Sequence, residues 1–212
     1  MDTRLIWITP EAEKNILYCA RVSSPENQQS TNVGLLNYCL KHGHWSPFEM
    51  ANACIEIKTS RAISAQILRH RSFSFQEFSQ RYSKATTYEV YEARSQDNKN
   101  RQNSIDDLSE DTKMWFEDAQ RMNGEACFEL YQEALDRGVA KEQARMLLPI
   151  NTSTTLYMNG SIRSWIHYIN LRAEAGTQKE HRDIAVAIRN IFIQELPNIS
   201  DALEWNKDGI LL

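Results

Sequence analysis

The segment from residue 69 to residue 82 reads RHRSFSFQEFSQRY, and its residue types suit a loop that holds phosphates and a planar ring together. Arg69, His70 and Arg71 are consecutive, and Ser79 follows Arg71 by eight positions. A guanidinium donates paired hydrogen bonds to phosphate oxygens, and its flat face can stack on a heterocycle. A basic helix end followed by a surface turn would also explain the triplet, so other parts of the chain must decide between these interpretations.

Further cationic side chains lie on segments with helical patterns. Arg163 and His167 are one turn apart on one predicted helix, and Arg172 lies near the C-terminal end of that helix. Arg145 lies among apolar neighbours on a short predicted helix. A buried guanidinium needs a partner, because an unpaired one is very costly. A salt bridge to one of the 28 acidic residues explains any single arginine, but a shared anionic ligand explains the set better.

The sequence lacks the standard motifs of several other chemistries. No GxGxxG or GxxxxGK[ST] loop occurs, so a nucleotide would be held by side chains and helix ends. There is no GxSxG elbow, and the sequence fixes no activating base for Ser79, so we assign Ser79 no nucleophilic role. His42 and His44 form a loose pattern that no Cys or carboxylate cluster completes, and no metal site is predicted.

The composition of the 212 residues is that of an ordinary globular protein, with 42% apolar and 25% charged residues. The net charge of −4 disfavours a nucleic-acid partner, which needs a broadly basic surface. No apolar run is as long as a membrane span and the first residues do not resemble a signal peptide, so we expect no membrane partner and a cytoplasmic location. The four cysteines are widely scattered and are expected to be reduced thiols.

The hydrophobic pattern predicts a single domain over residues 1–212, of the α/β class (α+β, mostly helical with a small mixed sheet). Gly and Pro positions and helix-capping residues set the expected boundaries. Helices are expected over about residues 9–20, 31–41, 60–71, 108–137, 141–148, 161–174 and 179–196, and strands over 51–58, 88–91 and 152–158. Residues 46–50 are expected to form one turn and residues 95–106 a loose polar excursion. The helix over 108–137 could be interrupted near Gly124.

The chain resembles the flavin-dependent thymidylate synthases, whose signature is RHR, seven residues, and then Ser. Other segments look like family segments in the family's order. They read ARVS at 20–23, HGH at 42–44, SPFE at 46–49, RYS at 81–83, AR at 144–145, LP at 148–149 and NLRA at 170–173. The resemblance covers roughly residues 19–190 and implies the fold of that family.

The resemblance also implies a reaction. NADPH reduces bound FAD, methylenetetrahydrofolate supplies one carbon to C5 of dUMP, and reduced flavin supplies the hydride that completes the methyl group. The products are dTMP and tetrahydrofolate. The family does not depend on a cysteine nucleophile, and the matched segments here contain no Cys. Relatives are homotetramers whose active sites are built between subunits, which would explain why the implied ligands are spread along the whole chain.

The site residues are likewise those that the resemblance implies. Arg172 is the expected catalytic residue, because a fixed cation at the N3/O4 edge of uracil makes C5 nucleophilic. The expected dUMP-binding residues are Gln66, Glu77, Ser79, Arg81, Arg145 and Arg172. The expected FAD-binding residues are Ser23, His44, Ser46, Glu49, Arg69, His70, Arg71, Arg163 and His167. His44 is expected near the flavin and the folate entrance.

Three positions depart from the family pattern. Ser161 and His167 stand where relatives often carry Asn, and Met50 replaces a frequent His. We expect each to alter flavin affinity or turnover without removing the activity.

Two other classes of function fit the sequence less well. A metal-dependent nucleotide phosphohydrolase would need adjacent His-Asp ligands, and no His-Asp dipeptide occurs in the chain. A non-enzymatic module that binds RNA or a nucleotide conflicts with the net charge of −4.

Overall fold

The computed structural model describes residues 2–208. Its central feature is a four-stranded sheet in the order β1 (Asp2–Ile8), β2 (Asn52–Ser60), β6 (Ser153–Ser161) and β3 (Ser74–Glu77). All three pairings in this sheet are antiparallel. The predicted fold class is therefore confirmed, but the prediction of a mixed sheet is wrong. A parallel pair needs a crossover that returns the chain to run the same way, whereas each strand here runs opposite to its neighbours.

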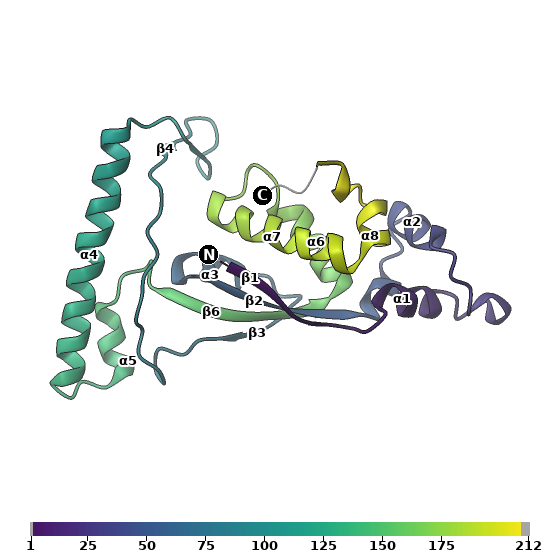
Figure 1. The fold of residues 1–212 in the computed structure, drawn as a ribbon, viewed down its shortest axis with the longest axis horizontal. Coiled ribbons are helices and arrows are strands. Elements are labelled where there is room, and N and C mark those ends of the chain that lie inside the picture. The colour runs from purple at the N-terminus through teal and green to yellow at the C-terminus, as the bar shows by residue number, and fades with distance from the viewer. Residues whose placement is uncertain (1, 209–212) are drawn as a thin grey trace.

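Helices α6 (Ile162–Arg172) and α7 (Lys179–Glu195) cover one face of this sheet (Figure 1). Along β6, buried residues alternate with more exposed ones, as expected when one face of a strand meets the core. The side chains buried between the layers include Ile55, Ile57, Leu156, Met158, Trp165, Ile169, Ile188 and Phe192. This packing holds α6 against the sheet, and Arg172 is the last residue of that helix.

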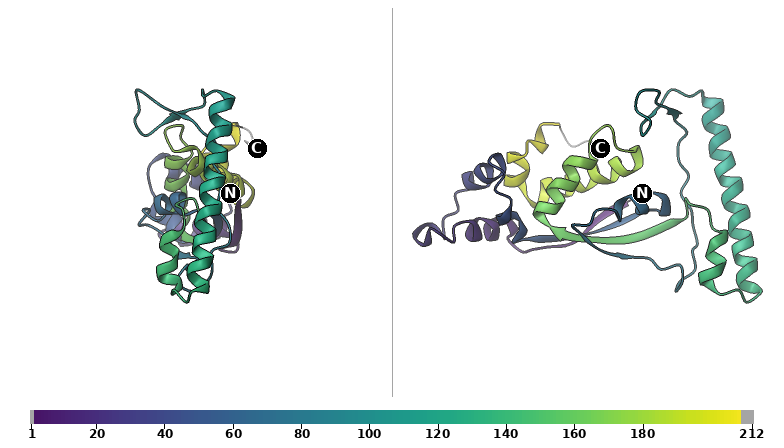
Figure 2. Two further views of the ribbon diagram at one scale, coloured as in Figure 1. Left: turned by 90° about the vertical axis from the view of Figure 1, so that its left-hand side faces the viewer. Right: turned by 180° about the vertical axis from the view of Figure 1, so that it is seen from behind.

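The two ends of the molecule carry the remaining helices. Helices α1 (Ala12–Ala20) and α2 (Gly34–Lys41) lie at one end, and α4 (Glu110–Asp136) lies at the other (Figure 1 and Figure 2). Two short segments, α8 (Pro197–Ala202) and the 3₁₀ turn η4 (Trp205–Asp208), follow α7. Leu196, immediately before α8, is buried in the core and anchors the start of α8.

Helix α4 runs without a break through Gly124, although this glycine was a candidate interruption. A Cβ at Gly124 would lie 2.5 Å from the ring of Tyr88, so the glycine permits a close contact with Tyr88. The helix is long but mostly polar. Within residues 2–208, no helix is both long and apolar enough to span a membrane.

Serine caps begin the two helices that position the predicted site. Ser60 Oγ accepts a hydrogen bond from the Ile63 N–H at 3.5 Å at the start of α3 (Arg61–Ile67). Ser161 Oγ accepts one from the Ser164 N–H at 3.2 Å at the start of α6. These caps satisfy N–H groups that would otherwise lack a partner. The RHR triplet begins two residues after the end of α3 instead of lying within its last turn.

The turn at residues 46–49 agrees with its predicted place, and two other short turns were not predicted. The segment expected to form one turn is the 3₁₀ turn η2 (Ser46–Glu49), and a similar turn, η1 (Pro25–Asn27), follows α1. Helix α2 ends just before Gly43, whose φ of 68° is easily adopted only by glycine. Residues 141–148 divide into α5 (Lys141–Ala144) and the 3₁₀ turn η3 (Arg145–Leu147).

The strand predicted over residues 88–91 is wrong, because only Tyr88 forms an isolated bridge, with Thr152. The polar excursion over 95–106 instead contains a small hairpin of β4 (Ser95–Gln96) and β5 (Ser104–Ile105).

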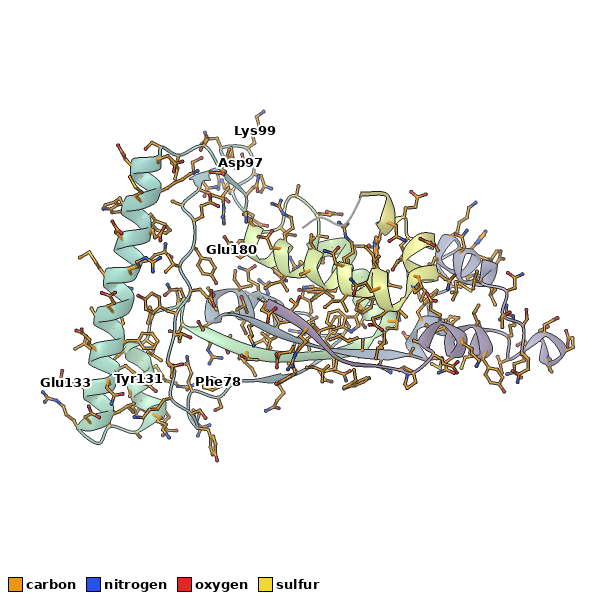
Figure 3. The ribbon with its side chains drawn as sticks, viewed as in Figure 1. Phe78, Asp97, Lys99, Tyr131, Glu133 and Glu180 are labelled. Carbon is orange, nitrogen blue, oxygen red and sulfur yellow. The ribbon has the colours of Figure 1, made fainter. Side chains whose placement is uncertain are left out.

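Polar side chains stabilise the turn of this hairpin. The Asp97 carboxylate accepts hydrogen bonds from the backbone N–H groups of Lys99 at 2.7 Å and Asn100 at 3.1 Å (Figure 3). The polar composition of this segment therefore reflects hydrogen bonding within a tight turn.

Candidate functional site

The RHR triplet contacts the end of α6 through its histidine. Arg172 Nε donates a hydrogen bond to His70 Nε2 at 2.9 Å. The ring of Tyr168, one turn earlier on α6, lies edge-on to His70 with the ring centroids 4.9 Å apart. The predicted catalytic arginine and the centre of the RHR motif are thus brought into direct contact.

This contact fixes the protonation state of His70. Burial of the imidazole, together with the positive charge of Arg172, lowers the pKa of His70 to about 4. The ring is therefore neutral near pH 7. Because Nε2 accepts from Arg172, the proton of the neutral ring is on Nδ1, where it can be donated to a ligand.

The other two arginines of the triplet are exposed. Among residues 2–208, no acidic side chain pairs with Arg69 or Arg71. Two unpaired guanidinium groups beside a neutral imidazole form a donor set that suits a diphosphate and a planar ring. These residues therefore fit the FAD that the sequence predicted.

Helix α6 also positions a second group of predicted flavin residues. Arg163 forms an ion pair with Glu49 of η2. The His167 ring lies 4.4 Å from that of Trp45, and burial and the Arg163 charge lower the pKa of His167. Ser46 is the first residue of η2. The predicted flavin residues of η2 and α6 therefore lie side by side.

One hydrogen bond joins the residue just after the RHR triplet to α6, near Arg163 and His167. Ser164 Oγ donates to the backbone carbonyl of Ser72 at 3.2 Å. Ser161, one of the departures from the family pattern, caps the same helix. The structure thus gives Ser161 a capping role that does not depend on a flavin contact.

Two predicted flavin residues lie elsewhere in the chain. Ser23 is in the turn after α1, and the His44 ring packs edge-on to Tyr38 with centroids 5.6 Å apart. Over residues 2–208, no hydrogen bond or ion pair joins Ser23 or His44 to the RHR triplet. His44 directly precedes Trp45, whose ring contacts His167, so His44 lies beside the η2–α6 group and does not bond to the triplet.

Three predicted dUMP residues form a separate cluster, comprising Ser79, Arg81 and Arg145. Arg81 forms an ion pair with Glu142 at 3.2 Å. Arg145 Nε donates to the backbone carbonyl of Glu142, also at 3.2 Å. Ser79 and Arg81 line an open pocket of about 540 Å³ together with Lys141 and Tyr82. Within residues 2–208, no hydrogen bond or ion pair joins this cluster to Gln66, His70 or Arg172.

Glu77 has structural partners that the sequence did not indicate. Its carboxylate pairs with Arg61 at 2.6 Å and accepts hydrogen bonds from Ser64 Oγ at 2.6 Å and Thr154 Oγ1 at 3.1 Å. The residue joins β3 to α3 and β6. A contact between Glu77 and dUMP would use the carboxylate lone pairs that these three partners leave free.

Gln66 belongs to a hydrogen-bonded network that sequence reasoning missed. Its Nε2 donates to Gln178 Oε1 at 2.6 Å, and its Oε1 lies 3.4 Å from His181 Nδ1. His181 Nε2 lies 3.0 Å from the hydroxyl of Tyr168. The only sequence signal for this network was a lone histidine on the apolar face of a helix, which is more often a structural core residue.

Comparisons with known proteins show the family of the chain. The family model described as thymidylate synthase complementing protein matches residues 4–198. The chain is 56% identical to a flavin-dependent thymidylate synthase of Synechocystis sp., with 97% of this chain and 100% of the relative covered. The chain belongs to the flavin-dependent thymidylate synthase family.

Other family members are also similar over most of their length. A probable flavin-dependent thymidylate synthase of Paramecium bursaria Chlorella virus 1 is 55% identical, with 97% of this chain and 100% of the relative covered. A flavin-dependent thymidylate synthase of Thermus thermophilus is 33% identical, with 87% and 69% covered.

Among solved structures, the fold of this family member matches a UMP/dUMP methylase PolB from Streptomyces cacaoi that was crystallised with 5-Br dUMP. The TM-score is 0.87 at 24% identity, with 96% of this chain and 94% of that chain covered. At this identity the match supports the fold alone.

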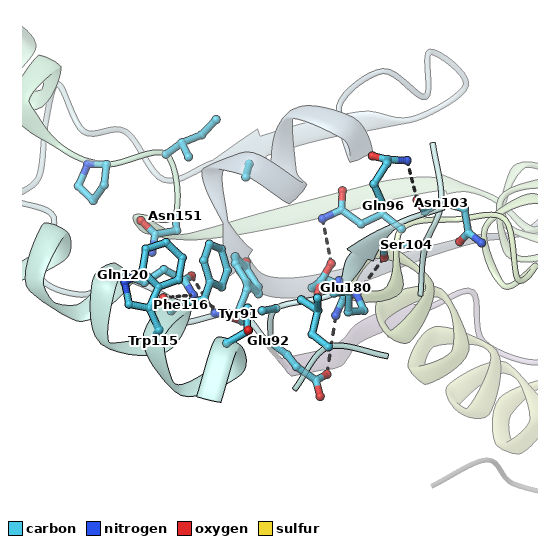
Figure 4. Close-up of a pocket in the computed structure, with 18 of the residues that line it drawn as sticks. Tyr91, Glu92, Gln96, Asn103, Ser104, Trp115, Phe116, Gln120, Asn151 and Glu180 are labelled. Atoms are coloured by element: carbon cyan, nitrogen blue, oxygen red, sulfur yellow. Dashed lines mark hydrogen bonds and ion pairs between the residues drawn. The ribbon is translucent and has the colours of Figure 1, made fainter. Parts of the chain in front are cut away.

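A cavity of about 780 Å³ lies beside the family motifs, between the 95–105 hairpin, α4 and the start of α7 (Figure 4). Tyr91, Trp115 and Phe116 form its apolar wall, and Arg94 and Glu180 its charged end. None of the predicted site residues lines it. Its charged end nevertheless reaches the site, because Gln178 lines the cavity and hydrogen-bonds to Gln66.

Proposed function

We propose that this protein is a flavin-dependent thymidylate synthase that methylates dUMP to dTMP. FAD is the bound cofactor, and methylenetetrahydrofolate and NADPH are the carbon and electron donors. The observation that carries the proposal is the contact between His70 and Arg172 within a chain of which 97% matches a member of this family. It gives the reaction a neutral imidazole and a guanidinium side by side.

Arg172 is the residue to which we assign activation of uracil. Its Nε is used by His70, and no partner among residues 2–208 occupies its two terminal nitrogens. Those nitrogens are available for O4, at the N3/O4 edge of uracil. A fixed cation there stabilises negative charge on the ring and makes C5 nucleophilic without a covalent bond to the protein.

The remaining residues bind and orient. Arg69, Arg71 and the η2–α6 group would hold FAD, and Gln66, Ser79, Arg81 and Arg145 would hold dUMP. When bound, reduced FAD supplies the hydride that completes the methyl group. The rings of Phe73 and Tyr168 pack around His70 and limit the access of water to this side of the site.

We further propose that the complete site is shared between copies of the chain in a homotetramer. The separation of the Ser79–Arg81–Arg145 cluster from the His70–Arg172 pair supports this arrangement, because one nucleotide would then contact residues of two copies. The partners are small molecules, without nucleic acid or membrane, and the cytoplasm is the compartment in which we place the reaction.

The test is formation of dTMP by the purified protein with FAD, NADPH, methylenetetrahydrofolate and dUMP. We expect dTMP only when all four are present. Omission of one component at a time is the control, and replacing NADPH with NADH identifies the preferred reductant. A folded protein that binds FAD but forms no dTMP in the complete mixture would contradict the proposal.

A further inference from the structure

A chain of hydrogen bonds links a buried ion pair to the side-chain amide of Gln66. Glu180 at the start of α7 is 4% exposed and pairs with Arg94 (Figure 4). Gln178 Nε2 donates to Glu180 Oε2 at 2.8 Å, and Gln178 Oε1 accepts from Gln66 Nε2 at 2.6 Å. The chain of hydrogen bonds continues from Gln66 to His181 and then to Tyr168.

The charge on Glu180 sets the direction of every hydrogen bond that follows. Burial raises the pKa of the Glu180 carboxyl, but hydrogen bonds from Arg94, its own backbone N–H and Gln178, with the charge of Arg94, outweigh burial and lower the pKa overall. An ionised carboxylate can only accept hydrogen bonds. Gln178 must therefore point its NH₂ group at Glu180, which leaves its oxygen to face Gln66.

The same logic fixes Gln66 and its further neighbours. Because the oxygen of Gln178 is an acceptor, Gln66 must present its NH₂ group to Gln178 and its oxygen to His181. His181 then carries its proton on Nδ1 and accepts from the Tyr168 hydroxyl at Nε2. Every member of the chain has a donor facing an acceptor in this direction, and reversing Gln66 alone would place two donors or two acceptors face to face.

The fixed amide leaves part of its hydrogen-bonding capacity for a ligand. Gln66 has two N–H groups and two oxygen lone pairs, and its neighbours occupy one of each. One N–H donor and one acceptor remain. Uracil presents the complementary pair, an N3–H donor beside a carbonyl acceptor. Cytosine presents the opposite pair at the same place, an N3 acceptor beside an N4 amino donor.

We propose that Gln178, anchored by Glu180, locks the amide of Gln66 in one orientation and thereby makes Gln66 select uracil over cytosine in a 2′-deoxynucleoside monophosphate. The inference rests on the proposed function, which places Gln66 against dUMP. Gln178 acts through Gln66 and is a positioning residue. A glutamine amide that could turn freely would accept either base, whereas a locked one leaves unpaired groups against cytosine.

The experiment compares binding of dUMP and dCMP to the FAD-loaded protein and to variants at position 178. The residue Gln178 is exposed, and Gln178→Ala removes its hydrogen bonds to Gln66 and Glu180 while Arg94 still pairs with Glu180. In this variant Gln66 can turn, and we expect the preference for dUMP over dCMP, taken as the ratio of Kd values, to fall about tenfold or more.

Gln178→Lys is the sharper variant, because it should reverse the amide. An ammonium group beside Glu180 offers Gln66 a donor in place of an acceptor. Gln66 would then turn its oxygen toward position 178, and His181 and Tyr168 can exchange their donor and acceptor roles to follow. We expect the preference for dUMP to fall further than in Gln178→Ala. Lys179→Ala, which removes only an exposed ion pair with Asp183, is the matched control and should keep the wild-type ratio.

The readout separates positioning from a structural role. A structural defect would weaken binding of both nucleotides alike and leave their ratio unchanged. The inference would be overturned by a Kd ratio within about twofold of wild type in both Gln178 variants, or by recovery of the dUMP preference in Gln178→Lys. In either case, dUMP binding and dTMP formation by the wild type would leave the proposed function intact. A wild-type protein that fails to bind dUMP would contradict the proposed function itself.

Discussion

The hydrogen bond from Arg172 to His70 joins two residues 102 positions apart in the chain. The sequence predicted a site role for each of them, because both lie in segments that resemble one family. It could not predict that they touch, since their contact depends on how α6 returns across the sheet to the loop after α3. The network of Gln66, Gln178, His181 and Tyr168 was missed for the same reason.

Replacing Arg172 with Ala should lower the rate of dTMP formation at least about a hundredfold, because the cation that stabilises charge on uracil is lost. The flavin should remain largely bound, since the other predicted FAD residues are intact. The measurements are single-turnover dTMP formation and FAD absorbance. Arg182→Ala, which removes a half-buried arginine outside the predicted site, is the control. Normal turnover in Arg172→Ala would disprove the assigned role.

Cys54→Ala should retain activity close to that of the wild type. Cys54 lies in β2, and burial raises the pKa of its thiol, so it is protonated and unreactive near neutral pH. The substitution tests the mechanism without a cysteine nucleophile. Turnover and circular dichroism are measured together, because a folded but inactive Cys54→Ala protein would contradict that mechanism.

His181 should make the protein sensitive to mild acid. Burial, followed by the charges of Arg172 and His70, lowers the pKa of His181 to about 3 in the folded state. The unfolded chain binds a proton near pH 6.5, so the stabilisation is complete above that pH and is lost as the pH falls toward 3. Between pH 7 and pH 5 the loss should be about 2 kcal/mol in the free energy of unfolding.

The comparison is urea unfolding of the wild type and His181→Gln at both pH values. Glutamine keeps a donor for Gln66 and an acceptor for Tyr168 but does not titrate. We expect the variant to lose about 2 kcal/mol less than the wild type over this range. Equal losses in the two proteins would show that His181 is not the group responsible.

At the scale of elements, the sequence predicted most helices because their caps are local signals. Ser60 and Ser161 mark the starts of α3 and α6, and Gly43 lies just past the end of α2. The edge strands β1 and β3 were missed. An edge strand buries only one face and has a hydrogen-bonded neighbour on only one side, so the hydrophobic patterns of β1 and β3 are weak. The basic triplet before β3 also favoured the prediction of a loop.

Strand β6 touches the RHR loop at a glycine, which makes Gly160 a test of how the elements position the motif. A Cβ at Gly160 would lie 2.5 Å from the ring of Phe73, which packs against Trp165 with ring centroids 4.8 Å apart. Gly160→Ala must therefore displace Phe73 and the loop that carries His70. We expect a loss of about 1–3 kcal/mol in stability and weaker FAD binding.

The matched control is Gly176→Ala, where an added Cβ would have no neighbour within 4 Å. Thermal unfolding and FAD titration of the two variants give the comparison. If Gly160→Ala bound FAD as tightly as Gly176→Ala, the loop would not be positioned through this contact.

At the scale of the whole molecule, no hydrogen bond or ion pair among residues 2–208 joins Ser79, Arg81 or Arg145 to Gln66 or Arg172, although all five are predicted dUMP residues. The Ser79–Arg81–Arg145 cluster lies near α5, and Gln66 and Arg172 lie beside α7. A list of site residues taken from sequence has no spatial content, so this division could be found only from the fold. The division makes the association of several copies of the chain a part of the proposed catalytic mechanism.

Mixing two inactive variants should restore activity if copies share their sites. Arg81→Ala and Arg172→Ala each damage a different half of the site, and a mixed assembly contains some sites with neither substitution. Unfolding and refolding an equal mixture should restore up to about a quarter of wild-type dTMP formation, from the statistics of random assembly in symmetric oligomers. Each variant refolded alone is the control, and a mixture no more active than these would exclude sharing between copies.

The most direct test of the account is the visible absorption spectrum of the protein with FAD, recorded before and after adding dUMP. We expect a protein-bound flavin spectrum that shifts when dUMP is added, because the nucleotide and the flavin would lie together beside His70 and Arg172. A spectrum of free flavin that does not respond to dUMP would contradict the claim that these residues form a single site for both.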